Sequence, residues 1–208
     1  MSSEQRSGAM SVAEAIRRKR AVRAYTPEPV PEEVMMAVLN AGRRAQSSKN
    51  SQPWTFVLVT EREQLARVAG AGVYAAHMNN AAFAVVLVGA PGSEFDLGQA
   101  AANMQLAATA AGVGSCVTTL HDEQLAREVL GVPADLSCRW SITFGYSAEP
   151  DRPPRPGSRR PIEEVVRRER YKSAGQVFHE QVIVWAGAAR AVVRKEPGPC
   201  AHLFGNQR

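Results

Sequence analysis

The sequence predicts a single domain of helices and strands arranged around one helix that is buried on every side. Three observations lead to this prediction. From Leu97 to Leu120 the chain carries no charged residue, and apolar and small residues occupy every face of the helix that begins near Phe95. Four short β-prone segments alternate with segments of helical spacing. The length of 208 residues, 45% of them hydrophobic, is enough to bury one core.

The N-terminal part predicts two helices joined by a proline-rich turn. A helix is expected from Ser11 to Lys19, with Ser11 as its N-cap and Glu14 as the capping-box partner. It ends in a basic run, Arg17 to Arg20. Pro31 suits the first turn of the second helix, expected from Glu32 to Ala45, where apolar residues recur at helical spacing.

A polar loop over residues 45–54 leads from the second helix into the first strand, Thr55 to Thr60. The segment from Glu61 to Ala69 is an amphipathic helix by its spacing. Whether helix resumes from Tyr74 to Asn79, after a glycine-rich break, stays open. Phe83 to Val88 is apolar throughout, which is typical of a central strand.

The buried helix is expected to stop at Gly112 and Gly114, because glycine favours helix C-termini. It must be covered either by the sheet of the same subunit or by the matching helix of a second copy. The later elements expected are a strand (Ser115–Thr119), a short helix (Asp122–Leu130), a strand (Cys138–Phe144), an extended arm (Pro150–Pro161) and a charged helix (Glu163–Arg170).

Four strands separated by helices are also compatible with a doubly wound α/β fold. The turn after the first strand, in TFVLVTERE, has no G-x-G-x-x-G pattern, which argues against a Rossmann dinucleotide site.

Composition limits the partners and the compartment. The net charge of +5 and the pI of about 9.4 favour an anionic partner, either nucleic acid or a phosphorylated small molecule. The three cysteines, at positions 116, 138 and 200, have no metal-ligand spacing and leave an odd thiol. No apolar signal segment or membrane span is visible. We therefore expect a soluble cytoplasmic protein with reduced thiols and no metal.

Three separated segments resemble the flavin-dependent nitroreductase family. KRAVRAY (residues 19–25) is similar to that family's basic N-terminal signature, and SSKNSQPWTFVLV (47–59) to its Ser-rich loop, which ends in Gln-Pro-Trp before a strand. LGQAAANMQLAATAAGVGSC (97–116), with the strand after it, is similar to its central helix. A Gly-Tyr at 145–146 and an arm ending in RRPIEEV follow in the same order, so the resemblance covers roughly Ala13 to Tyr171.

The resemblance implies an α+β fold of three layers, in which a mixed β-sheet is flanked by helices. It also implies an obligate homodimer with the long central helix at the interface. The nitroreductase-like domain would span residues 11–171. Residues 172–208 would form a C-terminal extension that either packs on the partner subunit or is poorly ordered.

The same resemblance implies two FMN sites, each built from both subunits. Hydride would pass from NADH or NADPH to FMN and then, in ping-pong turnover, to a nitroaromatic or quinone-like acceptor. A flavin dehydrogenase or reductive dehalogenase of the same superfamily, acting on a specific small molecule, is the alternative, because fold resemblance does not separate these activities.

The resemblance assigns site residues to three places in the chain. The phosphate and ribityl chain of FMN would be held by Lys19, Arg20, Arg23 and Arg159, and by the backbone of Ala21, where the family often has Ser. The ribityl hydroxyls and the pyrimidine edge would be reached by Ser47, Ser48, Asn50 and Gln52. Gln46 stands where the family usually has Pro, which predicts a less rigid loop.

The third place is the strand after the central helix, at Val117, Thr118 and Thr119, which would face N5 of the flavin. A backbone N–H or a Thr hydroxyl there would stabilise charge at N5 of the reduced cofactor. Thr119 is the first choice for this catalytic role and Thr118 the second.

Each set of residues also has a plainer interpretation. The basic run suits a solvated helix C-terminus, the polar loop suits an ordinary surface turn, and residues 117–119 suit a buried strand. His77 fits a surface position better than a ligand. A nucleic-acid-binding protein is a third hypothesis, but the chain lacks a recognition helix, a zinc finger and an aromatic-basic β platform.

Overall fold

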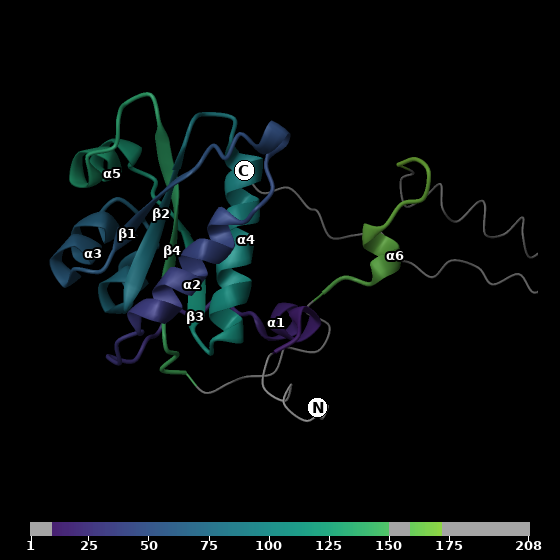
Figure 1. The fold of residues 1–208 in the computed structure, drawn as a ribbon, viewed down its shortest axis with the longest axis horizontal. Coiled ribbons are helices and arrows are strands. Elements are labelled where there is room, and N and C mark those ends of the chain that lie inside the picture. Colours follow the sequence, from purple (N-terminus) through teal and green to yellow (C-terminus); the bar gives the residue numbers. More distant parts are fainter. Residues whose placement is uncertain (1–9, 150–158, 172–208) are drawn as a thin grey trace, which may run out of the picture. The chain divides into compact units, whose positions relative to one another are not determined.

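The computed structural model describes residues 10–149 and 159–171 of the chain, as two parts that are considered separately. The first part contains α1 (Val12–Arg18), α2 (Glu32–Arg43), the 3₁₀ turn η1 (Ser48–Asn50), β1 (Thr55–Val59), α3 (Arg62–Ala69), the 3₁₀ helix η2 (Ala76–Asn80), β2 (Phe83–Gly89), α4 (Glu94–Ala110), β3 (Gly114–Thr119), α5 (Glu123–Leu130) and β4 (Ser137–Gly145) (Figure 1). The second contains only α6 (Ile162–Val165).

The four strands form one sheet in the order β1-β2-β4-β3, and each neighbouring pair is antiparallel. The resemblance implied a mixed sheet. Within the described residues the only parallel pairing is an isolated bridge between Ala21 and Ser115. β3 is an edge strand because it is last in the strand order. The segment that follows α1 lies against part of its outer edge.

Helices cover both faces of the sheet and give the expected three layers (Figure 1). On one face, α2 and α4 pack over side chains such as Val85 and Ile142. On the other, α3, η2 and α5 pack over Ala84 and Val86. β2 is buried along its whole length because both faces are covered, which confirms the prediction of a central strand.

The long helix α4 is covered on one side only by its own chain, so burial on every side is wrong for the single chain. Leu97 and Met104 are almost fully buried against the sheet and α2. Phe95, by contrast, is 80% exposed. The exposed or partly exposed positions on its other side recur at helical spacing, at Phe95, Gly98, Ala102, Leu106 and Thr109.

Local signals fixed several element ends. The side chain of Ser11 accepts a hydrogen bond from the backbone N–H of Glu14 at 3.2 Å, as predicted for the N-cap. Asp122 accepts from the N–H of Leu125 at 3.0 Å and caps α5. Gly131 ends α5 with a left-handed φ of 67°, a conformation that costs glycine little.

The helical segment left open after the glycine-rich break and the charged helix are both shorter than the ranges considered. Only Ala76–Asn80 is helical after the glycine-rich break, and it is 3₁₀. The charged helix covers Ile162–Val165, because the backbone of Val166 is extended. Residues 150–158 of the expected arm and all of 172–208 lie outside the described residues. None of the described helices is long and apolar enough to cross a bilayer.

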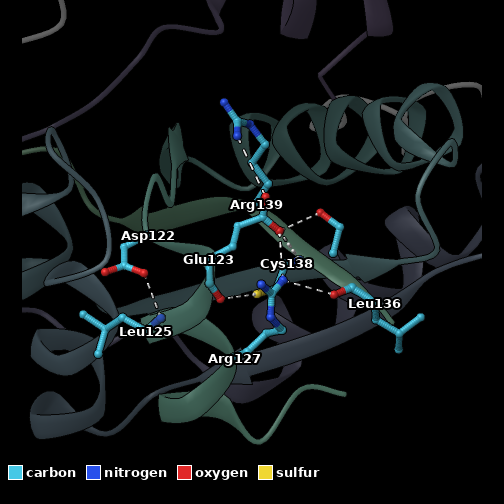
Figure 2. Close-up of polar contacts among 8 residues, drawn as sticks. Asp122, Glu123, Leu125, Arg127, Leu136, Cys138 and Arg139 are labelled. Atoms are coloured by element: carbon cyan, nitrogen blue, oxygen red, sulfur yellow. Dashed lines mark hydrogen bonds and ion pairs between the residues drawn. The ribbon is translucent and has the colours of Figure 1, made fainter. Parts of the chain in front are cut away.

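Figure 2 shows how α5 is fixed to the start of β4. The Glu123 carboxylate accepts hydrogen bonds from the Ser137 hydroxyl at 3.0 Å and the Cys138 backbone N–H at 3.3 Å. The Arg127 guanidinium lies 3.5 Å from the same carboxylate. Burial, and secondarily the charge of Glu123, raises the pKa of the Cys138 thiol. These contacts anchor β4, the strand on which β3 is built.

Candidate functional site

The outer edge of β3 is where most of the predicted site residues meet. The backbone N–H of Val22 donates to the carbonyl of Ser115 at 3.0 Å, so the segment from Lys19 to Arg23 lies along the first half of this edge. Among the described residues, no strand or bridge pairs with the outer side of Val117 to Thr119. Gly72 packs against the Thr119 carbonyl, since a Cβ added at Gly72 would lie 2.8 Å from that oxygen. The outward backbone N–H groups of Val117 and Thr119 remain available to a ligand or to another chain.

Side chains alternate along β3, which separates its two threonines. Val117 pairs with Ile142 and therefore lies on the face that carries α2 and α4, and Thr119 shares that face. Val117 is 41% exposed and Thr119 is partly exposed, whereas Thr118 is buried on the opposite face. Thr119 is thus the more accessible of the two threonines.

A buried tyrosine ties the basic segment to the sheet. The Tyr25 hydroxyl lies 2.6 Å from the Val22 carbonyl and 2.8 Å from the Thr143 hydroxyl. Burial raises the pKa of Tyr25 well above its usual value, so the phenol stays neutral. Gly114 completes the attachment, because a Cβ added there would lie 2.7 Å from Cγ2 of Val22. The segment can approach β3 this closely only because Gly114 has no side chain.

The basic residues divide into two groups according to their partners. Arg17 and Arg18 both form ion pairs with Glu14. Lys19, Arg20 and Arg23 have no ion-pair partner among the carboxylates that the structure describes. Arg20 donates to the carbonyls of Arg17 and Lys19, both at 2.7 Å, which fixes one end of its guanidinium.

A buried polar chain links Lys19 to β3. The Lys19 ammonium donates to Oε1 of Gln105 on α4 at 3.4 Å, and Nε2 of Gln105 donates to the Ser115 hydroxyl at 3.2 Å. Gln105 is 7% exposed and Ser115 1%. Sequence reasoning missed this contact, because Gln105 is one of several amides in an otherwise apolar helix.

The Ser-rich loop has an unusual backbone. Lys49, Asn50 and Gln52 all have positive φ, at 52°, 54° and 49°, although none is glycine. Left-handed residues of this kind cost energy and are concentrated at ligand-binding sites. The loop is held by its own contacts: the Ser47 hydroxyl accepts from the N–H of Gln52 at 2.9 Å, and the Ser47 carbonyl from the N–H of Asn50 at 3.0 Å.

The loop and the basic segment attach to different stretches of α4. Gln99 donates to the carbonyl of Gln46, which precedes the loop, at 3.5 Å, whereas Lys19 contacts Gln105. Six helical residues separate the two points, or about 9 Å along the axis. Arg159 is exposed and lies in the second described part, so its meeting with the first basic cluster stays a prediction.

His77 carries a feature that sequence reasoning did not find. One ring nitrogen, Nδ1, lies 3.1 Å from the Tyr74 carbonyl, while the other, Nε2, is buried without a hydrogen-bond partner in the described structure. Burial lowers the pKa of His77. The predicted surface position is therefore wrong for this nitrogen. No group of three or more His, Cys, Asp or Glu residues within 10–149 and 159–171 could hold a metal ion.

Known proteins resemble this chain over most of its length. The model of the nitroreductase family matches residues 16–86 and 65–146, together more than half of the chain. An NADH dehydrogenase of Thermus thermophilus is 26% identical over 190 residues, covering 72% of this chain and 91% of that protein.

Two solved structures show the same architecture. An FMN-dependent nitroreductase from Clostridium difficile superposes with a TM-score of 0.68 at 25% identity, over 76% of this chain and 98% of that one. An NADPH:FMN oxidoreductase from Vibrio harveyi, complexed with NAD⁺, superposes with a TM-score of 0.71 at 22% identity, over 85% and 86%, and at that identity shows the fold alone.

Proposed function

The chain belongs to the nitroreductase family, and from that premise we propose that it is an FMN-dependent oxidoreductase. It takes electrons from NADH or NADPH and delivers them in ping-pong turnover to a nitroaromatic or quinone-like acceptor. The observation that carries this proposal is the basic segment bridged to the edge of β3. Lys19, Arg20 and Arg23 stand there without a carboxylate partner among the described residues.

The residues present fit a phosphorylated flavin. The three cations suit the phosphate, and Arg can contact it with two parallel N–H groups. Arg159 would join them from the second described part. Side-chain donors and acceptors for the ribityl chain and the pyrimidine edge would come from Ser47, Ser48, Asn50 and Gln52. The backbone of Ala21 adds to the phosphate end.

FMN supplies the hydride chemistry when bound, and the protein's part is to bind, orient and stabilise charge. The unpaired outer edge over Val117 to Thr119 offers backbone N–H groups to a ligand atom that becomes negative on reduction. Thr119 is the catalytic candidate, because its side chain is partly exposed. The backbone N–H and C=O of Thr118 face Ser141 of β4, and its side chain is buried on the opposite face, so this strand offers the ligand Val117 and Thr119 instead.

The site is completed by a second copy of the chain in this proposal. The loop and the basic segment meet α4 about 9 Å apart along its axis, and the far side of α4 is left open with Phe95 80% exposed. An apolar face of this kind is typically covered by a partner. A homodimer packed through α4 would cover it and bring one copy's loop toward the other's basic segment.

The proposal includes a cytoplasmic location, which the thiols support. Cys116 and Cys138 are both free and buried, as expected in a reducing cytoplasm, where we place the protein.

The direct test is to purify the protein, denature it and identify the released small molecule. FMN should be recovered, and the apoprotein should take it up. Recovery of no flavin, together with no uptake, would end the proposal. With the flavin established, rapid reduction by NADH or NADPH followed by steady-state assays on nitroaromatics, quinones and halogenated phenols would separate the reductase from the dehydrogenase or dehalogenase alternative.

A second test addresses the phosphate. A charge-assisted contact contributes about 1.5–3 kcal/mol, so Arg20→Ala or Arg159→Ala should weaken FMN binding by roughly 10- to 100-fold. Arg17→Ala, which removes a residue already paired with Glu14, is the matched control and should change little. Riboflavin lacks the phosphate, so its affinity should hardly change. Equal losses for FMN and riboflavin would show that the arginines are structural.

A further inference from the structure

The contact between Lys19 and Gln105 has a consequence for ligand selection. The Lys19 side chain is partly buried against α4, and its ammonium is 3.4 Å from an amide oxygen rather than from a carboxylate. A partly buried ammonium normally needs a compensating partner. The carboxylate nearest in sequence, Glu14, already pairs with Arg17 and Arg18.

The orientation of the Gln105 amide is fixed by its neighbours. An ammonium can only donate, so the amide atom that faces Lys19 must be the oxygen. The amide nitrogen then faces the Ser115 hydroxyl, which can accept, at 3.2 Å. The Ser115 carbonyl also accepts a hydrogen bond from the backbone N–H of Val22. The hydrogen bonds from Lys19 through Gln105 therefore end on the residue that binds the basic segment to β3.

A neutral acceptor leaves the charge of Lys19 uncompensated. A carboxylate in the same place would hold the ammonium equally well but would cancel its field toward any further anion. An apolar side chain would cancel nothing but would leave the ammonium without a fixed position. Glutamine alone among these choices provides both a fixed position and a free charge.

We propose that Gln105 is a positioning residue that makes the site select a phosphorylated ligand, by holding the Lys19 ammonium with a neutral acceptor. This inference rests on the proposed flavin function and adds the source of its selectivity. Gln105 does not touch the ligand. It acts through Lys19, and its effect therefore appears in the ratio of FMN to riboflavin affinity.

The test replaces Gln105 with Glu, which keeps the acceptor and nearly the same shape while adding one negative charge. Flavin fluorescence titration should show FMN affinity reduced about tenfold or more and riboflavin affinity nearly unchanged. The control is Gln64→Glu on α3, where Gln64 donates to the Val129 carbonyl at 2.9 Å in a partly buried place far from Lys19 in the sequence. It should leave the affinity ratio as in the wild type.

A double mutant separates action through Lys19 from a general effect on folding. In a Lys19→Met background, Gln105→Leu, which releases the ammonium without adding a charge, should cause little additional loss of FMN affinity, although it lowers that affinity when Lys19 is present. An equal loss in both backgrounds overturns the proposal, as does a wild-type ratio in Gln105→Glu. If Gln105→Glu does not fold, Ser115→Ala, which removes the other contact of the amide, should lower the ratio in the same direction, and an unchanged ratio also overturns it.

The outcomes differ from failure of the proposed function itself. If the wild-type protein binds neither flavin, the flavin function fails. If it binds FMN more tightly than riboflavin and both variants keep that preference, the function stands and only the role of Gln105 is wrong.

Discussion

Replacing Gly114 by Ala should displace the basic segment from β3. The added Cβ would lie 2.7, 2.9 and 3.0 Å from Cγ2, Cβ and Cγ1 of Val22. Ordinary contacts between carbon atoms are about 3.5–4.0 Å, so Val22 must move outward by roughly 0.5–1 Å. Gly114 is not among the residues with positive φ, so alanine can adopt its backbone conformation and the effect comes from the steric clash alone.

The size of the effect follows from what that displacement breaks. The N–H of Val22 donates to Ser115 at 3.0 Å, and a shift of that size stretches this bond toward or past the limit of hydrogen-bond geometry. Overpacking typically costs about 1–3 kcal/mol, and a lost hydrogen bond about 1 kcal/mol. We expect Gly114→Ala to lower the free energy of unfolding by about 2 kcal/mol and to weaken FMN binding tenfold or more.

Urea unfolding and flavin titration measure the two effects on the same samples. Val22→Ala removes two of the three close atoms, so the double mutant should recover part of both losses, which is a favourable coupling in a double-mutant cycle. Full wild-type stability and FMN affinity in Gly114→Ala would refute the reasoning. Losses that Val22→Ala makes worse would show that the clash is with some other part of the structure.

Two further predictions concern the open face of α4 and the buried His77 nitrogen. A Cβ added at Gly98 would meet no atom within 4 Å outside its own turn of α4. Gly98→Ala should therefore stabilise an isolated chain by about 0.5–1 kcal/mol but weaken a dimer packed closely through α4. Sedimentation that shows an unchanged dimer in a more stable variant would argue against that interface. Burial lowers the pKa of His77. Below the unfolded pKa of about 6.5, the unfolded chain therefore binds a proton that the folded chain does not. The free energy of unfolding consequently decreases as the pH is lowered. In urea unfolding, the His77→Gln variant should therefore lose less stability than the wild type as the pH is lowered from about 7.5 to 5.5. Equal losses in the two proteins would contradict the assignment of this pH dependence to His77.

The sequence by itself determined the elements and the family. The N-cap Ser11 begins α1 and Gly131 ends α5 where the local pattern predicted, because a cap depends on only three or four neighbouring residues. The apolar run from Phe83 predicted a central strand, and burial of all of β2 confirms it. The ordered segments beginning at Lys19, Ser47 and Leu97 indicated the nitroreductase family, which the family model confirms.

Tertiary structure decided which neighbours each residue packs against or hydrogen-bonds. The pattern of α4 showed that the helix must be covered, yet only the fold revealed that its own chain covers one side and leaves Phe95 exposed. Gln105 looked like any other amide until Lys19 and Ser115 were brought to either end of it, from 86 and 10 residues away. A cap or an apolar run depends on neighbouring residues, whereas the partner of a side chain is supplied by segments distant in sequence. This is why the contact of Lys19 with Gln105 could not be predicted from the sequence.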